Sequence, residues 1–183
     1  MKNVSIERVD MNAVSPEILE QWAKCYCEIW KEPPWNEDFW RPESVIADFR
    51  KEMQNPDAVA FLAMNEGNVV GFTHGYSVGK GELGAIAENN LLDLVFDRER
   101  RIFYVDELGV AKSHRGQRIS IALTASLVRA AHDSGSTVIV LRTDIQAHAA
   151  RHVYERSGFI DLGIRDATHA ERTYWMLDAH KDI

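Results

Sequence analysis

The chain has 183 residues and a net charge of −7, which allows one domain with a substantial core and argues against nucleic acid as a partner, because phosphate neutralisation needs a basic face. No apolar run approaches the ~20 residues of a membrane helix, and the polar first residues lack a signal-peptide core. The two cysteines, Cys25 and Cys27, are too close for an ordinary disulfide framework, so we expect a cytoplasmic protein that binds no membrane.

The N-terminal half alternates strand and helix patterns. Ser15-Pro16 has the residue types of a helix N-cap and first turn, and Pro33-Pro34 ends that helix. Its apolar spacing places Cys25, and not Cys27, on the buried face. The predicted elements here are a strand over 4–9, helices over 16–32 and 42–53, a hairpin of strands 58–64 and 69–76, and a short extra helix over 88–96.

The C-terminal half continues the alternation. The predicted elements are a strand over 103–110, a helix from Ile119, a buried strand over 137–141, a helix over 147–156 that stops at Gly158, and closing strands over 159–162 and 173–177. No linker or repeat divides the chain. The pattern therefore predicts a single α/β domain with a mixed sheet over residues 1–183.

The segment between Glu107 and Leu123 carries the clearest chemical signal. A strand runs through a short polar loop directly into a helix, which leaves the first helical N–H groups unpaired at the positive end of the helix dipole. Such a helix start binds phosphate, and Arg115 and Arg118 in the loop add charge and bidentate donors. The sequence therefore predicts a site for a phosphate-bearing cofactor.

Three motifs, whose order along the chain also matches, resemble the GNAT superfamily of acetyl-CoA-dependent N-acetyltransferases. Arg115-Gly116-Gln117-Arg118-Ile119-Ser120 resembles the family's phosphate loop, Leu108-Gly109-Val110 its pantetheine-binding strand, and Tyr154-Glu155-Arg156-Ser157-Gly158-Phe159 its Tyr-Glu-Lys-x-Gly-Phe signature. The resemblance covers about the C-terminal half. It implies a mostly antiparallel central sheet flanked by helices, with splayed central strands.

Two positions depart from the family's pattern. Arg118 stands where the family usually has Gly, so a loop that needs a positive φ there would bind pyrophosphate less well, whereas a helical residue 118 would be harmless. Ala147 stands where many members have an Asn that contacts the cofactor. Whether residue 118 has a positive φ therefore decides whether the first departure weakens pyrophosphate binding.

The resemblance implies acetyl-CoA as co-substrate, and the residues themselves give no reason to expect a metal. The pantetheine arm carries amides that can pair with an exposed strand edge, and Gly109 leaves room for it; a bulge at this glycine would splay the neighbouring strands. His148 and His152 are four residues apart, but no Glu flanks them as in zinc proteases. The predicted cofactor-binding residues are Leu108, Gly109, Val110, Arg115, Gly116, Gln117, Arg118, Ile119 and Ser120.

Two side chains are candidates for the proton transfers. The family uses the tyrosine at the position of Tyr154 to protonate the leaving thiolate, although Tyr154 also fits the spacing of a core aromatic residue. Many relatives have an acidic base near residues 106–107. Strand alternation points Asp106 and Glu107 to opposite faces, and we expect Glu107 to be the base, with Asp106 as the alternative or a salt bridge as the competing role.

The acceptor side is predicted from an aromatic and acidic cluster after the first helix. Aromatic faces and carboxylates together suit an ammonium group, although core tryptophans with solvated charges between them would give the same pattern. Tyr76 and residues 80–99 are candidates for a further wall. The predicted acceptor-binding residues are Trp30, Trp35, Glu37, Tyr76 and Asp106.

The sequence thus predicts an acetyl-CoA-dependent N-acetyltransferase for the primary amine of a small, cationic acceptor. Acetylation of a protein N-terminus or lysine is the second enzymatic interpretation, and a non-catalytic acyl-CoA sensor is the third. A pocket closed by the tryptophans would favour a small molecule, and an open groove would favour a peptide. Relatives often form homodimers.

Overall fold

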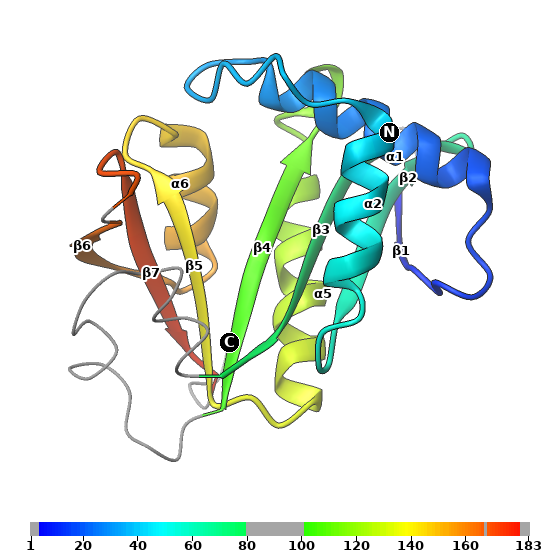
Figure 1. Ribbon diagram of the computed structural model, residues 1–183. Coiled ribbons are helices and arrows are strands. Elements are labelled where there is room, and N and C mark those ends of the chain that lie inside the picture. The colour runs from blue at the N-terminus through cyan, green and yellow to red at the C-terminus, as the bar shows by residue number, and fades with distance from the viewer. Residues whose placement is uncertain (1–3, 80–100, 167, 180–183) are drawn as a thin grey trace.

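The computed structural model describes residues 4–79, 101–166 and 168–179. Their seven strands form one sheet in the order β1-β2-β3-β4-β5-β7-β6, in which only β4 and β5 pair in parallel (Figure 1). This confirms the predicted α/β fold with a mostly antiparallel sheet. The strands are β1 (Val4–Arg8), β2 (Val59–Asn65), β3 (Asn68–Val78), β4 (Ile102–Val110), β5 (Val138–Asp144), β6 (Ile160–Arg165) and β7 (Arg172–Asp178).

Helices cover both faces of the sheet (Figure 1). Adjacent residues of β3 show the two layers, because Phe72 packs against Trp22 of α1 while a Cβ on Gly71 would touch Leu123 of α5. No described helix is both long and apolar enough to cross a bilayer. The described helices are α1 (Pro16–Trp30), α2 (Pro42–Glu52), the 3-10 turn η1 (Lys112–His114), α5 (Ile119–Asp133) and α6 (His148–Arg156).

The helix boundaries agree with the predicted ones to within a residue or two, but the buried face of α1 differs. Cys27 is buried and Cys25 is half-buried, the reverse of the expectation. The reason is that Trp22, Ala23 and Tyr26 define the buried stripe, and Cys27 lies one turn after Ala23. The expected helix over 88–96 and the expected wall over 80–99 lie outside the described residues.

The sheet opens between β4 and β5. The two strands pair only from Ile102↔Val138 to Tyr104↔Val140, after which β4 continues to Val110 and β5 to Asp144 without pairing to each other. Figure 1 shows these two strands diverging toward the end at which α5 and α6 begin. The predicted splay of the central strands is therefore present, and it leaves one edge of β4 free.

A β-bulge lies in β4 at Asp106, and not at Gly109 as expected. The partners of Glu107 and Val105 are the adjacent residues His74 and Gly75, so Asp106 is the extra residue. The need for glycine at 109 has a different cause: a Cβ there would lie 2.7 Å from the ring of Phe72 and 3.0 Å from Ile29. Gly109 therefore lets α1 and β3 pack closely against β4.

Candidate active site

A cleft of about 790 Å³ fills the gap between the diverging strands. Its lining includes Leu108 to Val110 of β4, Gly116 and Arg118 of the loop, and Ile119 to Ile121 at the start of α5. The first N–H groups of α5 have no partner within the helix, so the cleft ends at an electropositive helix start. A helix start of this kind can bind a phosphate group, and the phosphate site stays a prediction.

The loop before α5 needs positive φ at two residues. Gly116 has φ +76°, and Arg118, the N-cap of α5, has φ +62°. The left-handed conformation costs a non-glycine residue about 1 kcal/mol. Arg118 therefore adopts a left-handed conformation that glycine would adopt without cost, its N–H is retained, and the cost is carried as backbone strain.

Arg115 lines the cleft and also makes two contacts that hold its loop in place. Its Nε donates to the carbonyl oxygen of Val110 at 3.0 Å, and its Nη1 donates to Glu32 Oε2 at 2.7 Å. The guanidinium therefore ties the phosphate loop to the segment after α1. The exposed Arg118 side chain also lines the cleft, and the exposed Gln117 is not part of the lining.

Tyr154 of α6 lines the same cleft on the side opposite β4. Its ring packs against Phe159 and Trp175, so the side chain is also a core residue, as the alternative interpretation expected. Burial and the nearby charge of Glu107 raise the pKa of the Tyr154 phenol above its ordinary value. Within the described part of the chain its hydroxyl makes no hydrogen bond, so the proton is held and is available to a ligand.

A second cavity, of about 310 Å³, adjoins the first, and Glu107 lines both. Tyr26 of α1 donates a hydrogen bond from its hydroxyl to Glu107 Oε1 at 3.0 Å. Burial and the neighbouring Asp106 carboxylate raise the pKa of Glu107 well above its ordinary value. A carboxylate with a raised pKa at the junction of two cavities is a stronger base than an ordinary glutamate.

Asp106 faces the same side of the sheet as Glu107, so the expectation that alternation would separate them is wrong. The bulge turns Asp106 toward Tyr76, whose hydroxyl donates to Asp106 Oδ2 at 3.0 Å, and toward His74 Nε2 at 3.9 Å. Tyr76 contacts Asp106 rather than lining the second cavity. Burial raises the pKa of Asp106, and the charge of His74 opposes that rise.

His74 of β3 forms a small cluster with two acidic residues, Glu52 of α2 and Asp106 of β4. Its Nε2 lies 3.0 Å from Glu52 Oε2, and one ligand atom each of Glu52, His74 and Asp106 lie within 4.8 Å of one another. Among the described residues this is the set whose donor atoms are close enough to hold a metal ion. His148 and His152 both line the cleft of about 790 Å³, which we call the cofactor cleft, and they do not form such a group.

The predicted aromatic and acidic cluster forms a stack. Trp35 and Trp30 lie with ring centroids 6.0 Å apart and 11° between planes, and Trp30 stacks on Tyr26 at 4.6 Å and 18°. Arg172 lies over the outer end, with its guanidinium carbon 5.7 Å from the Trp35 ring centroid. Glu37 accepts from Trp40 Nε1 at 2.7 Å and from Arg172 Nη2 at 3.3 Å, so a cation from within the chain already occupies part of this cluster.

Sequence reasoning missed several residues of the second cavity. Tyr26 had a detectable signal, because it shares the buried stripe of α1 with Trp22 and Trp30. His74 and Arg172 had none, since each belongs to a strand pattern that predicts only sheet positions. The missed lining residues are Trp22, Tyr26, Phe39, Val45, Asp48, Phe49, Glu52, His74, Arg142, His169 and Arg172.

Comparison with known proteins decides the family. Residues 16–159 match the family model described as "Acetyltransferase (GNAT) family". The chain belongs to the GNAT family of acetyltransferases. A mouse relative, "Probable N-acetyltransferase family 8 member 5", is 29% identical over 121 residues, which is 66% of this chain and 47% of that protein. This GNAT chain thus spans less than half the length of that curated relative.

Solved GNAT structures share the fold at low sequence identity. Aminoglycoside 6'-acetyltransferase type Ii superposes with a TM-score of 0.67 at 20% identity over 98% of this chain and 99% of that one. The NatC complex bound to Gag peptide and CoA superposes with a TM-score of 0.68 at 16% identity over 97% of this chain and 99% of that one. At these identities the likeness shows the fold, and it extends over nearly the whole chain.

Proposed function

We propose that this GNAT domain transfers the acetyl group of acetyl-CoA to the primary amine of a small, cationic acceptor. The observation that carries the proposal is that two cavities, one ending at an electropositive helix start and one walled by aromatic rings and carboxylates, meet at Glu107. Acetyl-CoA supplies the thioester-bound acetyl group. Every other task falls to residues of this chain.

The cofactor cleft supports binding of an extended phosphate-bearing molecule. The N–H groups at the start of α5 and the exposed Arg118 guanidinium are placed for the diphosphate, and the free edge of β4 from Leu108 to Val110 is placed for the amides of the pantetheine arm. A main-chain N–H near Val110 is the candidate donor to the acetyl oxygen as it gains charge.

The two proton transfers are assigned by position. Glu107, held by Tyr26, accepts the proton of the attacking amine, and the amine nitrogen forms its bond to the acetyl carbon as the carbon–sulfur bond breaks. Tyr154, on the opposite side of the cleft, donates its proton to the leaving sulfur. A raised pKa suits both groups, since it makes Glu107 a stronger base and keeps Tyr154 protonated.

The second cavity, which we call the acceptor pocket, favours a small cation. Its carboxylates Asp48 and Glu107 have no arginine, lysine or histidine partner among the described residues, whereas Glu52 lies 3.0 Å from His74 Nε2 and Glu37 is paired with Arg172. Aromatic rings beside unneutralised carboxylates attract an ammonium group. The volume of about 310 Å³ suits a molecule of a few carbons rather than a folded protein surface.

The single domain over 1–183 and the cytoplasmic location remain proposals from the sequence.

The test combines binding with turnover. Acetyl-CoA at millimolar concentration should raise the melting temperature, and free thiol should accumulate when a panel of primary amines is added. Absence of a thermal shift would overturn the proposal at the cofactor step. Binding of acetyl-CoA without turnover across a broad amine panel would favour the acyl-CoA sensor, and turnover confined to peptides would favour the protein acetyltransferase.

A further inference from the structure

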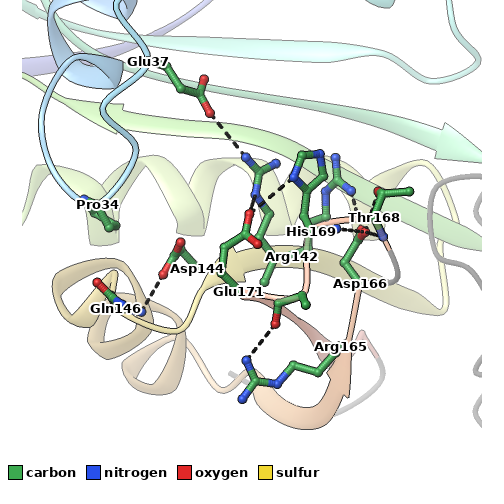
Figure 2. A network of polar contacts seen from close by, with 12 residues as sticks. Pro34, Glu37, Arg142, Asp144, Gln146, Arg165, Asp166, Thr168, His169 and Glu171 are labelled. Carbon is green, nitrogen blue, oxygen red and sulfur yellow. Dashed lines mark hydrogen bonds and ion pairs between the residues drawn. The ribbon is translucent and has the colours of Figure 1, made fainter.

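Arg172 joins the two halves of the opened sheet. It is the first residue of β7, on the β5-β7-β6 side, and its Nη2 lies 3.3 Å from Oε1 of Glu37, which belongs to the segment after α1 on the other side. The two side chains are 20% and 18% exposed, so the ion pair is largely shielded from water. Figure 2 shows Glu37 pointing from that segment toward the polar network around Arg142 and Glu171.

The turn that carries Arg172 is fixed by Asp166. The Asp166 side chain is fully buried, and its oxygens accept hydrogen bonds from Arg142, Tyr174, Thr168 and the His169 N–H. Figure 2 shows Arg142, Thr168 and His169 around Asp166. Burial disfavours its charge, but these donors hold the pKa of Asp166 below its ordinary value. The main chain of Arg172 is closed onto the same turn, since its carbonyl accepts from the Asp166 N–H and its N–H donates to His169.

On its other side, Arg172 is connected to the proposed base, Glu107, through a row of stacked aromatic rings. Its guanidinium lies over Trp35, Trp35 stacks on Trp30, Trp30 stacks on Tyr26, and the Tyr26 hydroxyl binds Glu107. Glu37 and Arg172 both line the acceptor pocket, together with Trp30 and Tyr26. The ion pair therefore forms the wall of that pocket that faces the β6–β7 turn.

We propose that Arg172, through its bridge to Glu37 and Trp35, is a specificity-determining residue that limits acceptors of this enzyme to small amines. An acceptor that continues past the pocket on this side must displace the bridge, and so must separate a shielded ion pair and leave the Trp35 face. A small amine leaves the bridge intact. This inference rests on the proposed acetyltransferase function and adds the contact that sets acceptor size.

The experiment compares acceptors of graded size. Butylamine, phenylethylamine, a tetrapeptide and a ten-residue peptide with free N-termini are assayed by thiol release with the wild type, Arg172→Met and Glu37→Gln. Arg172→Met keeps an unbranched apolar stem, and Glu37→Gln keeps the acceptor for Trp40 while removing the charge. Arg165→Met is the matched control, because Arg165 bonds the Ala170 carbonyl of the same turn and lines neither cavity.

We expect the ratio of kcat/KM for the ten-residue peptide to that for butylamine to rise about ten-fold in both bridge variants, with the affinity for CoA and the control ratio unchanged. A residue that only stabilises the fold would lower all four activities together and leave the ratio constant. An unchanged ratio in Glu37→Gln, which is nearly isosteric, overturns the inference even if Arg172→Met folds poorly. Failure of the wild type to acetylate any amine would instead overturn the proposed function, and the inference with it.

Discussion

The cofactor cleft and the acceptor pocket meet at Glu107 but are built from different kinds of groups. The cofactor cleft is lined by residues from three stretches, 29–35, 106–121 and 142–156, and its proposed phosphate and pantetheine seats are main-chain groups of one of them, the free edge of β4 and the loop and helix start that follow it. The acceptor pocket is formed by side chains from α1, α2, β3, β5 and β7, and several of these hold one another in place.

This difference predicts how each region responds to substitution. A main-chain seat keeps its N–H groups whatever side chain is present, which is how Arg118 can replace the family's glycine at φ +62°. A pocket of interlocked side chains loses more than one contact with each change. We therefore expect substitutions of Glu107 and of the side chains on its acceptor side to have large effects, and substitutions in the phosphate loop to have small ones.

The largest effect is expected for Glu107→Gln. Loss of a general base typically lowers kcat by about 10²–10⁴-fold, while the affinity for CoA, measured calorimetrically, should stay within two-fold because the amide keeps the contact with Tyr26. The wild-type kcat should rise with pH along a limb whose midpoint exceeds the ordinary glutamate value of 4.5, since burial and Asp106 raise the pKa of Glu107. A variant that retains wild-type kcat would remove Glu107 from the mechanism.

The same variant makes a prediction about stability. A carboxyl group whose pKa is raised on folding stabilises the folded state below its unfolded pKa, and this contribution is lost as pH rises through the folded pKa. Glu107→Gln should therefore raise the melting temperature relative to the wild type at pH 8, with the difference vanishing near pH 4. A gain of equal size at both pH values would show that charge burial is not its cause.

A somewhat smaller effect is expected for Tyr154→Phe. Removing the acid should lower kcat by about 10²-fold, and the ring packing against Phe159 and Trp175 should keep the fold and CoA binding intact. Tyr104→Phe is the matched control, because Tyr104 is equally buried and lines neither cavity. If both variants lose activity equally, Tyr154 is a packing residue and the sulfur receives its proton from elsewhere.

The same contrast explains how much could be predicted from the sequence. The phosphate loop, the β4 edge and the Tyr154 helix were recognisable because main-chain seats depend on short local patterns, and the element order followed from periodicity. The bulge at Asp106 was not predictable, because it is set by the register of β4 against His74 and Gly75. Nor were the contacts from Arg115 to Glu32 or from Arg172 to Glu37, whose partners lie 83 and 135 residues apart in the chain.

Arg118 gives a smaller effect that separates strain from charge. Arg118→Gly should raise the free energy of unfolding by about 1 kcal/mol, because glycine adopts positive φ without the steric cost. Arg118→Ala removes the charge but keeps the strain, so it should gain no stability. Denaturant titration measures both. If the two variants are equally stable, the left-handed residue carries no strain.

The smallest effect is expected from metal removal. Glu52, His74 and Asp106 have the donor atoms of a metal site, but these atoms already have partners: His74 Nε2 lies 3.0 Å from Glu52, and Tyr76 donates to Asp106. These contacts can satisfy the cluster without a metal ion, and a metal-free enzyme stays a prediction. Dialysis against a chelator should leave kcat within about two-fold, a change that corresponds to less than ~0.5 kcal/mol in the barrier. Activity lost on dialysis and restored by Zn²⁺ in the wild type, but not in His74→Gln, would instead make this cluster a metal site and would place a cation beside Glu107, where it would lower the pKa of the proposed base.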